Sequence, residues 1–366
     1  MIVSGNNVSE SEATGVRTAG IIGLGLIGGS IADALTHIGF RVGGVDSNPE
    51  TVQRAIDEGF IAHAGLPADA DMTIVATPVD AMVDGVEQAL RETTGWVTDT
   101  GSVKGPIAAA ISDPRFIPSH PMAGSEQSGL RGARAELFRG AAWVISPNGA
   151  TSDETVAAMH ELVIALGADC LTLTPDAHDR MVATVSHVPH LTAAALMNVA
   201  ASRSDEHAAM LRLAAGGFRD MTRVAAGSPT IWPPICVQNG EAITDALDDV
   251  ISRLQGLRDA VASADTDGIE SSLQSAREAR ASLPTSAVFP AGLSEVRVRV
   301  KDESGQLATI TGLAAELNVN IFNMEIAHSA EGPTGVVVLL VASDSAEVLR
   351  VGLKNNGYRP SVRPLS

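Results

Sequence analysis

The chain is poor in cysteine and in basic residues. Its 366 residues include only two cysteines, Cys170 and Cys236, and 25 basic residues stand against 43 acidic ones. Two cysteines cannot form a disulfide framework, so we expect both to be small core residues in a reducing compartment. The net charge of −18 argues against nucleic acid or an anionic membrane as the main partner, because both are bound by basic surfaces.

Long hydrophobic runs are also missing. No apolar stretch reaches the length of a transmembrane helix, and residues 1–17 are polar, without the apolar core of a secretory signal. We therefore expect residues 1–17 to form a disordered tail and the protein to be cytoplasmic, with no membrane partner. A hydrophobic content of 45% over this length is sufficient for two or three folded domains.

The first half of the remaining chain alternates in pattern. In residues 18–174, short apolar runs such as 72–76, 116–117 and 142–145 alternate with helical stretches. This alternation predicts an α/β domain of the Rossmann type, with one mostly parallel sheet covered by helices on both faces.

The second half is different. Residues 175–283 lose the strand signal, and Ala and Leu recur every three or four positions, so we expect an all-helical domain for substrate binding and dimerisation. Its first helices are predicted over 176–186 and 190–203. Residues 284–292 read as a linker because they hold prolines and no periodicity. Residues 293–366 follow the order β-α-β-β-α-β, which predicts a small ferredoxin-like domain.

A glycine-rich loop opens the first domain. Gly23-Leu-Gly25-Leu26-Ile27-Gly28 follows a predicted strand at once and starts a predicted helix, which is the context that makes this motif specific. Gly23 allows the tight turn, Gly25 leaves room for a pyrophosphate, and Gly28 lets helix and strand approach. Leu26 and Ile27 lie at the helix N-terminus, where amide groups attract phosphate. The loop predicts dinucleotide binding.

Two further strand ends belong to the same predicted site. Asp46 ends the second strand, where a carboxylate accepts hydrogen bonds from the ribose hydroxyls of NAD and repels the 2′-phosphate of NADP. Asp46 in front of Pro49 also suits a simple turn or helix cap. Thr77 and Pro78 end the next long strand and are placed beside the nicotinamide ribose, or equally form a strand-ending turn.

Polar side chains at the following strand ends predict chemistry. Ser102 and Lys104 follow the strand that ends near Asp99, and His120 follows the next strand along the chain. Because ligands of open α/β sheets bind at the carboxyl ends of the strands, we expect Ser102, Lys104 and His120 to converge above the cofactor.

These segments carry a resemblance to a known family. Five stretches occur in order over about residues 18–283, and together they resemble prephenate dehydrogenases: the glycine-rich loop and residues 98–105, 119–125, 185–190 and 216–223. In the C-terminal domain, the segments that contain Gly305 and Asn320 are similar to those of an ACT domain.

The resemblance implies an NAD-dependent oxidative decarboxylation of prephenate. A hydride leaves the ring carbon that bears the hydroxyl group, the ring carboxylate leaves as CO2, and aromatisation supplies most of the driving force. His120 would be the catalytic partner of that hydroxyl, as a neutral imidazole with an acceptor nitrogen. Ser102 would hydrogen-bond His120 or the hydroxyl and fix the orientation.

The resemblance also implies a substrate-binding set. Arg223 would bind a substrate carboxylate, because its planar guanidinium suits a bidentate contact, and Asp220 would orient it. His190 would meet the pyruvyl side chain. The remaining members are Lys104, His187 and Trp232. His187 or His190 could equally be a core histidine. No third ligand accompanies this pair, and the resemblance implies no metal.

Two alternatives stay open, and two partners are expected. Arogenate dehydrogenase has the same chemistry, with an amino group in place of the keto group. A non-catalytic regulator that senses NAD and an amino acid would use the same domains. We expect a homodimer and tyrosine as an effector that binds near Gly305 and Asn320, as ACT domains commonly bind amino acids at inter-subunit edges.

Overall fold

The chain divides into two compact units. The computed structural model describes residues 17–124, 127, 129–204, 213–282, 293–301, 303, 305–328 and 334–364. The first unit comprises residues 1–281 and the second residues 282–366. Residues 1–16 of the predicted tail and the whole predicted linker lie outside the described residues.

The first unit is built on a parallel sheet. Six strands pair in parallel in the order β3-β2-β1-β4-β5-β6, so the strand order reverses between β1 and β4. Ligands of such sheets bind at this reversal, outside the carboxyl ends of the strands. The strands are β1 Thr18–Ile22, β2 Arg41–Val45, β3 His63–Ala64, β4 Met72–Val75, β5 Trp96–Asp99 and β6 Phe116–Ile117.

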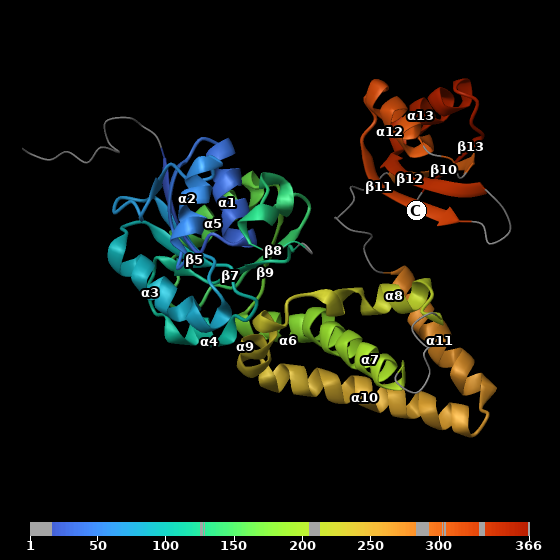
Figure 1. The fold of residues 1–366 in the computed structure, drawn as a ribbon, viewed down its shortest axis with the longest axis horizontal. Coiled ribbons are helices and arrows are strands. Elements are labelled where there is room, and N and C mark those ends of the chain that lie inside the picture. The colour runs from blue at the N-terminus through green and yellow to red at the C-terminus, as the bar shows by residue number, and fades with distance from the viewer. Residues whose placement is uncertain are drawn as a thin grey trace, which may run out of the picture. The chain divides into compact units, whose positions relative to one another are not determined.

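Helices cover both faces of this sheet (Figure 1). One core packs α1, α2 and α5 against one face and includes Ile31, Ala55 and Met159. A second core packs α3 and α4 against the other face and includes Val86 and Ile107. The predicted Rossmann-type sheet is therefore confirmed. The helices are α1 Leu26–His37, α2 Pro49–Asp57, α3 Met82–Glu92, α4 Gly105–Ala110 and α5 Asp153–Ala165.

A second, three-stranded sheet departs from the prediction of a single sheet. Strand β7 (Ser119–Pro121) pairs antiparallel with β8 (Ala142–Ile145), which pairs in parallel with β9 (Asp169–Thr172). Pro118 separates β6 from β7 and has no N–H to donate to a ladder. His120 therefore follows β6 of the large sheet, as predicted, but it lies within β7 of the small sheet.

The helical part follows β9 directly. The helix α6 (Pro175–Val182) continues through a π-helical turn, Ala183–His187, into α7 (Val188–Ser204). The predicted gap between two helices at 187–189 was wrong. Pro189 cannot donate to the preceding turn, and the wider π turn keeps the helix continuous where a regular helix would be broken.

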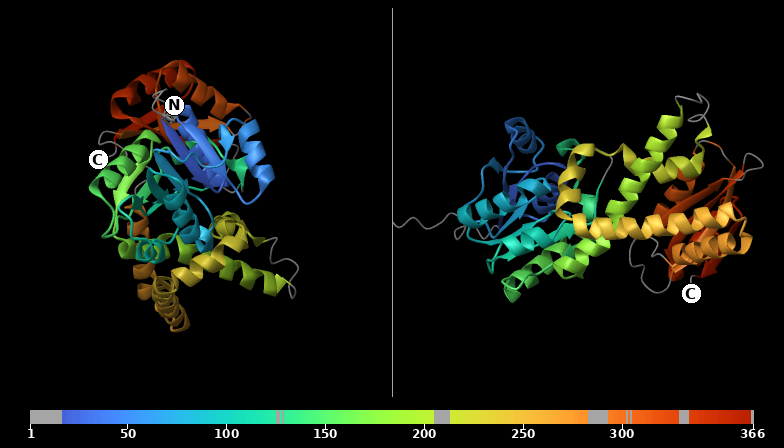
Figure 2. Two further views of the ribbon diagram at one scale, coloured as in Figure 1. Left: turned by 90° about the vertical axis from the view of Figure 1, so that its left-hand side faces the viewer. Right: turned by 90° about the horizontal axis from the view of Figure 1, so that it is seen from below.

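The chain then forms a long helical arm. Its elements are α8 Gly216–Thr222, α9 Trp232–Gln238, α10 Gly240–Ala262 and α11 Thr266–Ala281, with 3-10 turns over Arg223–Ala226 and Pro229–Ile231. Figure 2 shows α10 as one long helix, and α11 turns back to pack against it. Among the described residues, no helix is both long and apolar enough to cross a membrane.

The second unit has the predicted element order. Its sheet is antiparallel, in the order β11-β12-β10-β13, and both helices contribute to one core that includes Ile310, Val337 and Leu349. The succession β-α-β-β-α-β is that of the ferredoxin-like motif. The elements are β10 Leu293–Lys301, α12 Gln306–Glu316, β11 Ile321–His328, β12 Thr334–Ala342, α13 Ser343–Asn355 and β13 Pro360–Pro364.

Candidate active site

The glycine-rich loop joins β1 to α1 at the reversal of strand order. Gly23 has a φ of +90°, and a Cβ there would lie 2.6 Å from the carbonyl oxygen of Ala76. A Cβ on Gly28 would lie 1.8 Å from the carbonyl oxygen of Gly23. A Cβ on Gly25, in contrast, would meet nothing within 4 Å. Gly23 and Gly28 are packed tightly against the backbone, whereas Gly25 faces free space. Leu26 and Ile27 then begin α1.

Asp46 lies next to this loop. One oxygen of its carboxylate accepts a hydrogen bond from the backbone N–H of Leu24 at 2.8 Å, and the other accepts from the N–H of Asn48 at 2.9 Å. Asp46 thus stabilises the turn after β2 and also places its negative charge beside the glycine-rich loop. Thr77 and Pro78 follow β4, and the Thr77 hydroxyl lies 3.7 Å from the Sδ atom of Met82.

Lys104 is fully buried beneath the small sheet. Its ammonium group pairs with the carboxylate of Asp99, which is also fully buried, and donates to the carbonyl oxygen of Ser119 at 2.7 Å. Burial lowers the pKa of Lys104, although Asp99 acts against this shift. The expected convergence of Lys104 with His120 is found, but Lys104 supports the strand that carries the histidine.

The hydroxyl of Ser119 completes this buried network. It donates to the carbonyl oxygen of Asp99 at 2.7 Å and lies 2.9 Å from the hydroxyl of Thr98. The indole N–H of Trp143 donates to it at 3.1 Å. Together with the contact between the Ser119 N–H and Asp99, these bonds fix β7 to β5, and they set the position of His120, the next residue.

His120 is paired with a histidine that sequence analysis missed. Its Nδ1 atom lies 2.9 Å from Nε2 of His178, and the two rings meet edge to face. No hydrogen bond joins Ser102 to His120 within the described residues; Ser102 is half-buried in the loop after β5. Burial lowers the pKa of His120 well below its usual value, and the nearby positive charge of Lys104 lowers it further. The imidazole of His120 is therefore neutral.

His178 is itself bonded to the next residue. Its Nδ1 atom lies 2.7 Å from Oδ1 of Asp179, and its side chain is fully buried. Burial acts to raise the pKa of Asp179, but hydrogen bonds from His178 and from two backbone amides outweigh it and lower this pKa. The sequence shows only two adjacent polar residues within a predicted helix; their burial together with Val182 on one face of α6 is seen in the structure.

His187 ends the π-helical turn and is a buried core residue. The side-chain Nδ2 of Asn239 donates a hydrogen bond to the backbone carbonyl oxygen of Asp179 at 2.9 Å. The same nitrogen donates to Nδ1 of His187 at 3.2 Å. Burial lowers the pKa of His187 to about 4. His187 is thus neutral, with its proton on Nε2.

His190 and Trp232 are brought together from distant segments. Their rings stack with centroids 3.7 Å apart and an angle of 15°, and His187 meets the same indole edge to face at 6.1 Å. Burial lowers the pKa of His190. Trp232 begins α9, and Pro233 and Pro234 fill its first turn, where no N–H is needed. These two prolines therefore fit the local helix start.

Arg223 and Asp220 lie on a neighbouring exposed segment. Asp220 belongs to α8, and Arg223 opens the 3-10 turn that follows. This turn packs against α7, and Gly227 behind it faces the ring of His190, since a Cβ there would lie 3.7 Å from the imidazole Cε1. The segment with Arg223 and the one with His190 therefore adjoin. Among the described residues, no three potential ligands are arranged to hold a metal ion.

Two family models match most of the first unit. The family models "Prephenate dehydrogenase, nucleotide-binding domain" and "Prephenate dehydrogenase, dimerization domain" match residues 31–172 and 174–275. A prephenate dehydrogenase from Bacillus subtilis is 31% identical over 341 residues, which cover 88% of this chain and 92% of that protein.

Two solved structures extend the comparison. Prephenate dehydrogenase from A. aeolicus in complex with hydroxyphenyl propionate and NAD+ is similar with a TM-score of 0.69 and 25% identity, over 75% of this chain and 99% of that one. Arogenate dehydrogenase from Synechocystis is similar with a TM-score of 0.64 and 29% identity, over 72% and 99%.

Because His187 is neutral in the folded chain, we expect the folded state to lose stability as the pH is lowered. Its pKa is about 4 in the folded chain and about 6.5 in the unfolded chain. The unfolded state therefore binds more protons between these values, and the free energy of unfolding falls as the pH is lowered through this window. His187 should account for a loss of about 3 kcal/mol at pH ~4.

Urea unfolding at a series of pH values measures this loss. His187→Asn keeps an acceptor for Asn239 and should show a shallower dependence on pH than the wild type. His160→Asn is the matched control, because His160 is exposed on α5 and its replacement should leave the slope unchanged. Equal slopes for the wild type and His187→Asn would contradict a neutral, buried His187.

Proposed function

Because the chain belongs to the prephenate dehydrogenase family, we propose that it catalyses the NAD-dependent oxidative decarboxylation of prephenate to 4-hydroxyphenylpyruvate. The observation that carries the proposal is His120: a neutral, half-buried imidazole with a fixed Nδ1 atom, on a strand tied to the carboxyl end of β5. A neutral histidine is suited to accept the proton of a hydroxyl group that is being oxidised to a carbonyl.

The glycine-rich loop fits NAD as the cofactor. The open space at Gly25 and the amide groups at the start of α1 would hold its pyrophosphate. Asp46 would accept from the ribose hydroxyls, and its charge would repel a 2′-phosphate, so NAD is favoured over NADP. Leu26, Ile27, Thr77 and Pro78 would line the rest of the site. When bound, NAD supplies the acceptor for the hydride from the substrate ring.

His120 and Ser102 would act on the hydroxyl-bearing carbon. As the C–H bond breaks, His120 takes the hydroxyl proton and a carbonyl forms. Loss of CO2 then aromatises the ring, and the proton returns to the oxygen to give the phenol. Ser102 is assigned to the substrate hydroxyl, because its own hydroxyl is not bonded to His120. The site would also accelerate the reaction by holding the substrate and NAD in the geometry that hydride transfer requires.

The other substrate contacts are assigned to the helical part. Arg223 would bind a carboxylate in a bidentate contact, with Asp220 as its orienting partner. His190, stacked on Trp232, would contact the side chain of the substrate. His187 would support this group through its edge-to-face contact with Trp232. Lys104 is reassigned from substrate contact to support of β7, since its ammonium group is fully buried against Asp99.

Arogenate is the second candidate substrate, because the arogenate dehydrogenase of Synechocystis has a similar fold and 29% identity. The two substrates differ only in the amino or keto group of the side chain, which is far from His120. A purely regulatory protein is not favoured, since it has no use for the buried Asp179–His178–His120 chain.

Initial rates with both substrates and both cofactors test the assignment. We expect prephenate to be turned over faster than arogenate, and NAD to support faster turnover than NADP. His120→Asn should lower kcat by about 10²–10⁴-fold, while NAD binding, followed by fluorescence, is unchanged. A tenfold preference for arogenate would show that arogenate, and not prephenate, is the substrate. A His120→Asn variant as fast as the wild type would remove His120 from the mechanism.

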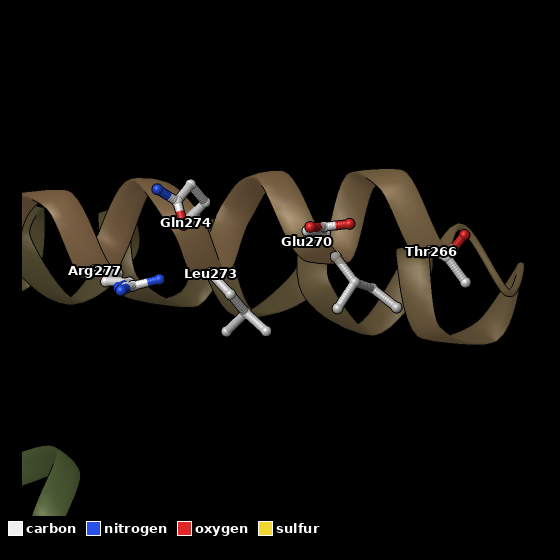
Figure 3. Close-up of a pocket in the computed structure, with 6 residues that line it drawn as sticks. Thr266, Glu270, Leu273, Gln274 and Arg277 are labelled. Atoms are coloured by element: carbon white, nitrogen blue, oxygen red, sulfur yellow. The ribbon is translucent and has the colours of Figure 1, made fainter.

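A homodimer is the proposed assembly, formed through the helical arm. Residues 174–275 match a model described as a dimerization domain, and apolar side chains on one face of α10 are exposed, namely Ile251, Leu254 and Val261. A shallow groove on α11 is lined by Thr266, Ile269, Glu270, Leu273, Gln274 and Arg277, and Figure 3 shows the labelled members of this set along the helix. A second copy of the chain would bury these side chains.

Leu273→Glu should separate the dimer. Leu273 is 61% exposed, so the change should not affect folding of the monomer, whereas a buried carboxylate would be costly in an interface. Light scattering should report a dimer for the wild type and a monomer for the variant. Ser271→Glu, an exposed neighbour on the same helix, should stay dimeric. A monomeric wild type, or a Leu273→Glu variant that is still a dimer, would refute the interface.

Regulation by tyrosine is assigned to the second unit, on the strength of its ferredoxin-like order and the similarity of its segments to an ACT domain. Gly305, with a φ of +94°, precedes α12, whereas the exposed Asn320 follows it. The 11 residues of α12 lie between the two in the sequence. The proposed tyrosine would bind near both residues, at an edge shared by two copies of this unit.

Truncation tests this regulation. A chain that ends at residue 290 keeps the first compact unit and should turn over prephenate at the rate of the full chain. Tyrosine should inhibit the full chain only, because linkage requires the second site. If tyrosine inhibits both forms equally, it binds at the active site, and the regulatory role of the second unit is wrong.

A further inference from the structure

Three side chains form a continuous series of hydrogen bonds that begins at the buried Asp179 and His178 and ends at the half-buried His120. The Oδ1 atom of Asp179 lies 2.7 Å from Nδ1 of His178, and Nε2 of His178 lies 2.9 Å from Nδ1 of His120. The side chain of His178 is fully buried. The order carboxylate–imidazole–imidazole has a direction, because each ring nitrogen is either a donor or an acceptor.

The direction follows from the chemistry of the carboxylate. An ionised carboxylate can only accept, so the proton of a neutral His178 is on Nδ1 and its Nε2 atom is an acceptor. His120 must then donate from Nδ1 to His178, which leaves its Nε2 atom without a proton. Within the described residues, no protein group donates to this Nε2 atom. It is available to accept the proton of a substrate hydroxyl.

The chain is anchored at its carboxylate end. Oδ1 of Asp179 also accepts from the backbone N–H of Lys104 at 2.8 Å, and Oδ2 accepts from the N–H of Gly105 at 2.7 Å. The backbone carbonyl of Asp179 is held by Asn239. The carboxylate of Asp179 therefore cannot turn away from His178. The hydrogen bonds of Asp179 to Lys104, Gly105 and Asn239 hold the series Asp179–His178–His120 in place.

We propose that His178 and Asp179 are positioning residues that hold His120 in the tautomer with a proton on Nδ1 and an accepting Nε2. This role rests on the proposed function. When the O–H bond of the substrate breaks, its proton goes to Nε2 of His120, and the resulting imidazolium keeps its Nδ1–H bond to His178. The negative charge of Asp179 stabilises this cation through the intervening ring, and the proton returns to the phenol oxygen after CO2 leaves.

Two replacements of His178 separate positioning from packing. The glutamine of His178→Gln places an amide oxygen near the former Nε2 atom and can accept from His120. The asparagine of His178→Asn is too short to do so. Both remove the ring, so a role in packing alone would make the two variants similar. A role in positioning makes His178→Gln close to the wild type and His178→Asn defective.

The tautomer of His120 is measured directly by ¹⁵N NMR of histidine-labelled protein without substrate. We expect the protonated nitrogen to be Nδ1 in the wild type and in His178→Gln, and Nε2, the form favoured in water, in His178→Asn. In parallel, kcat with prephenate and NAD should fall by about 10²-fold in His178→Asn and much less in His178→Gln. KM for prephenate should change little in either.

Three results would overturn the proposal: a wild-type His120 protonated on Nε2, the same tautomer in all three proteins, or equal kcat for the two variants. The wild-type spectrum alone is decisive if a variant fails to fold. A wild type that turns over neither prephenate nor arogenate would instead refute the proposed function, and with it the catalytic part of this role. The tautomer distinguishes that failure from a failure of the hydrogen-bond chain.

Discussion

The structure of the site depends on the buried ion pair of Lys104 and Asp99. The ammonium group of Lys104 joins the end of β5, through Asp99, to the backbone of β7, and its backbone N–H holds the carboxylate of Asp179 on α6. Removal of one member of such a buried pair typically costs about 3–5 kcal/mol, because the other charge is left without a partner. A single residue, through its side chain and its backbone N–H, therefore joins the large sheet, the small sheet and the helical part at their common edge.

This use of Lys104 changes the electrostatic view of the site. In a chain of net charge −18, a substrate with two carboxylates requires local positive charge, and Lys104 seemed from sequence to provide it. Its charge is instead matched by Asp99. Burial keeps His120 and His187 neutral, so these rings act as directed donors and acceptors. Arg223 and the amide groups at the start of α1 are the groups proposed to attract anions.

Local patterns made the frame of the site predictable. The glycine-rich loop, Asp46 and the order of strands and helices each depend on residues within a few positions of one another, and they were read from the sequence. The small sheet depends on Pro118, which ends one ladder and lets β7 turn to β8, and its partner strands are distant in the chain. His178 could not be assigned, because its meaning comes from His120, 58 positions away. The burial of Lys104 was missed for the same reason.

The hydrogen bond between His120 and His178 crosses the boundary between the two regions that match separate family models. One model ends at residue 172 and the other begins at residue 174, between β9 and α6. The acceptor nitrogen of the first region is thus oriented by a carboxylate of the second. The two regions cannot be exchanged independently between relatives, because a new helical region must bring a matching histidine and aspartate to the same place. We therefore expect the two regions to be inherited together in evolution, although each has a fold of its own.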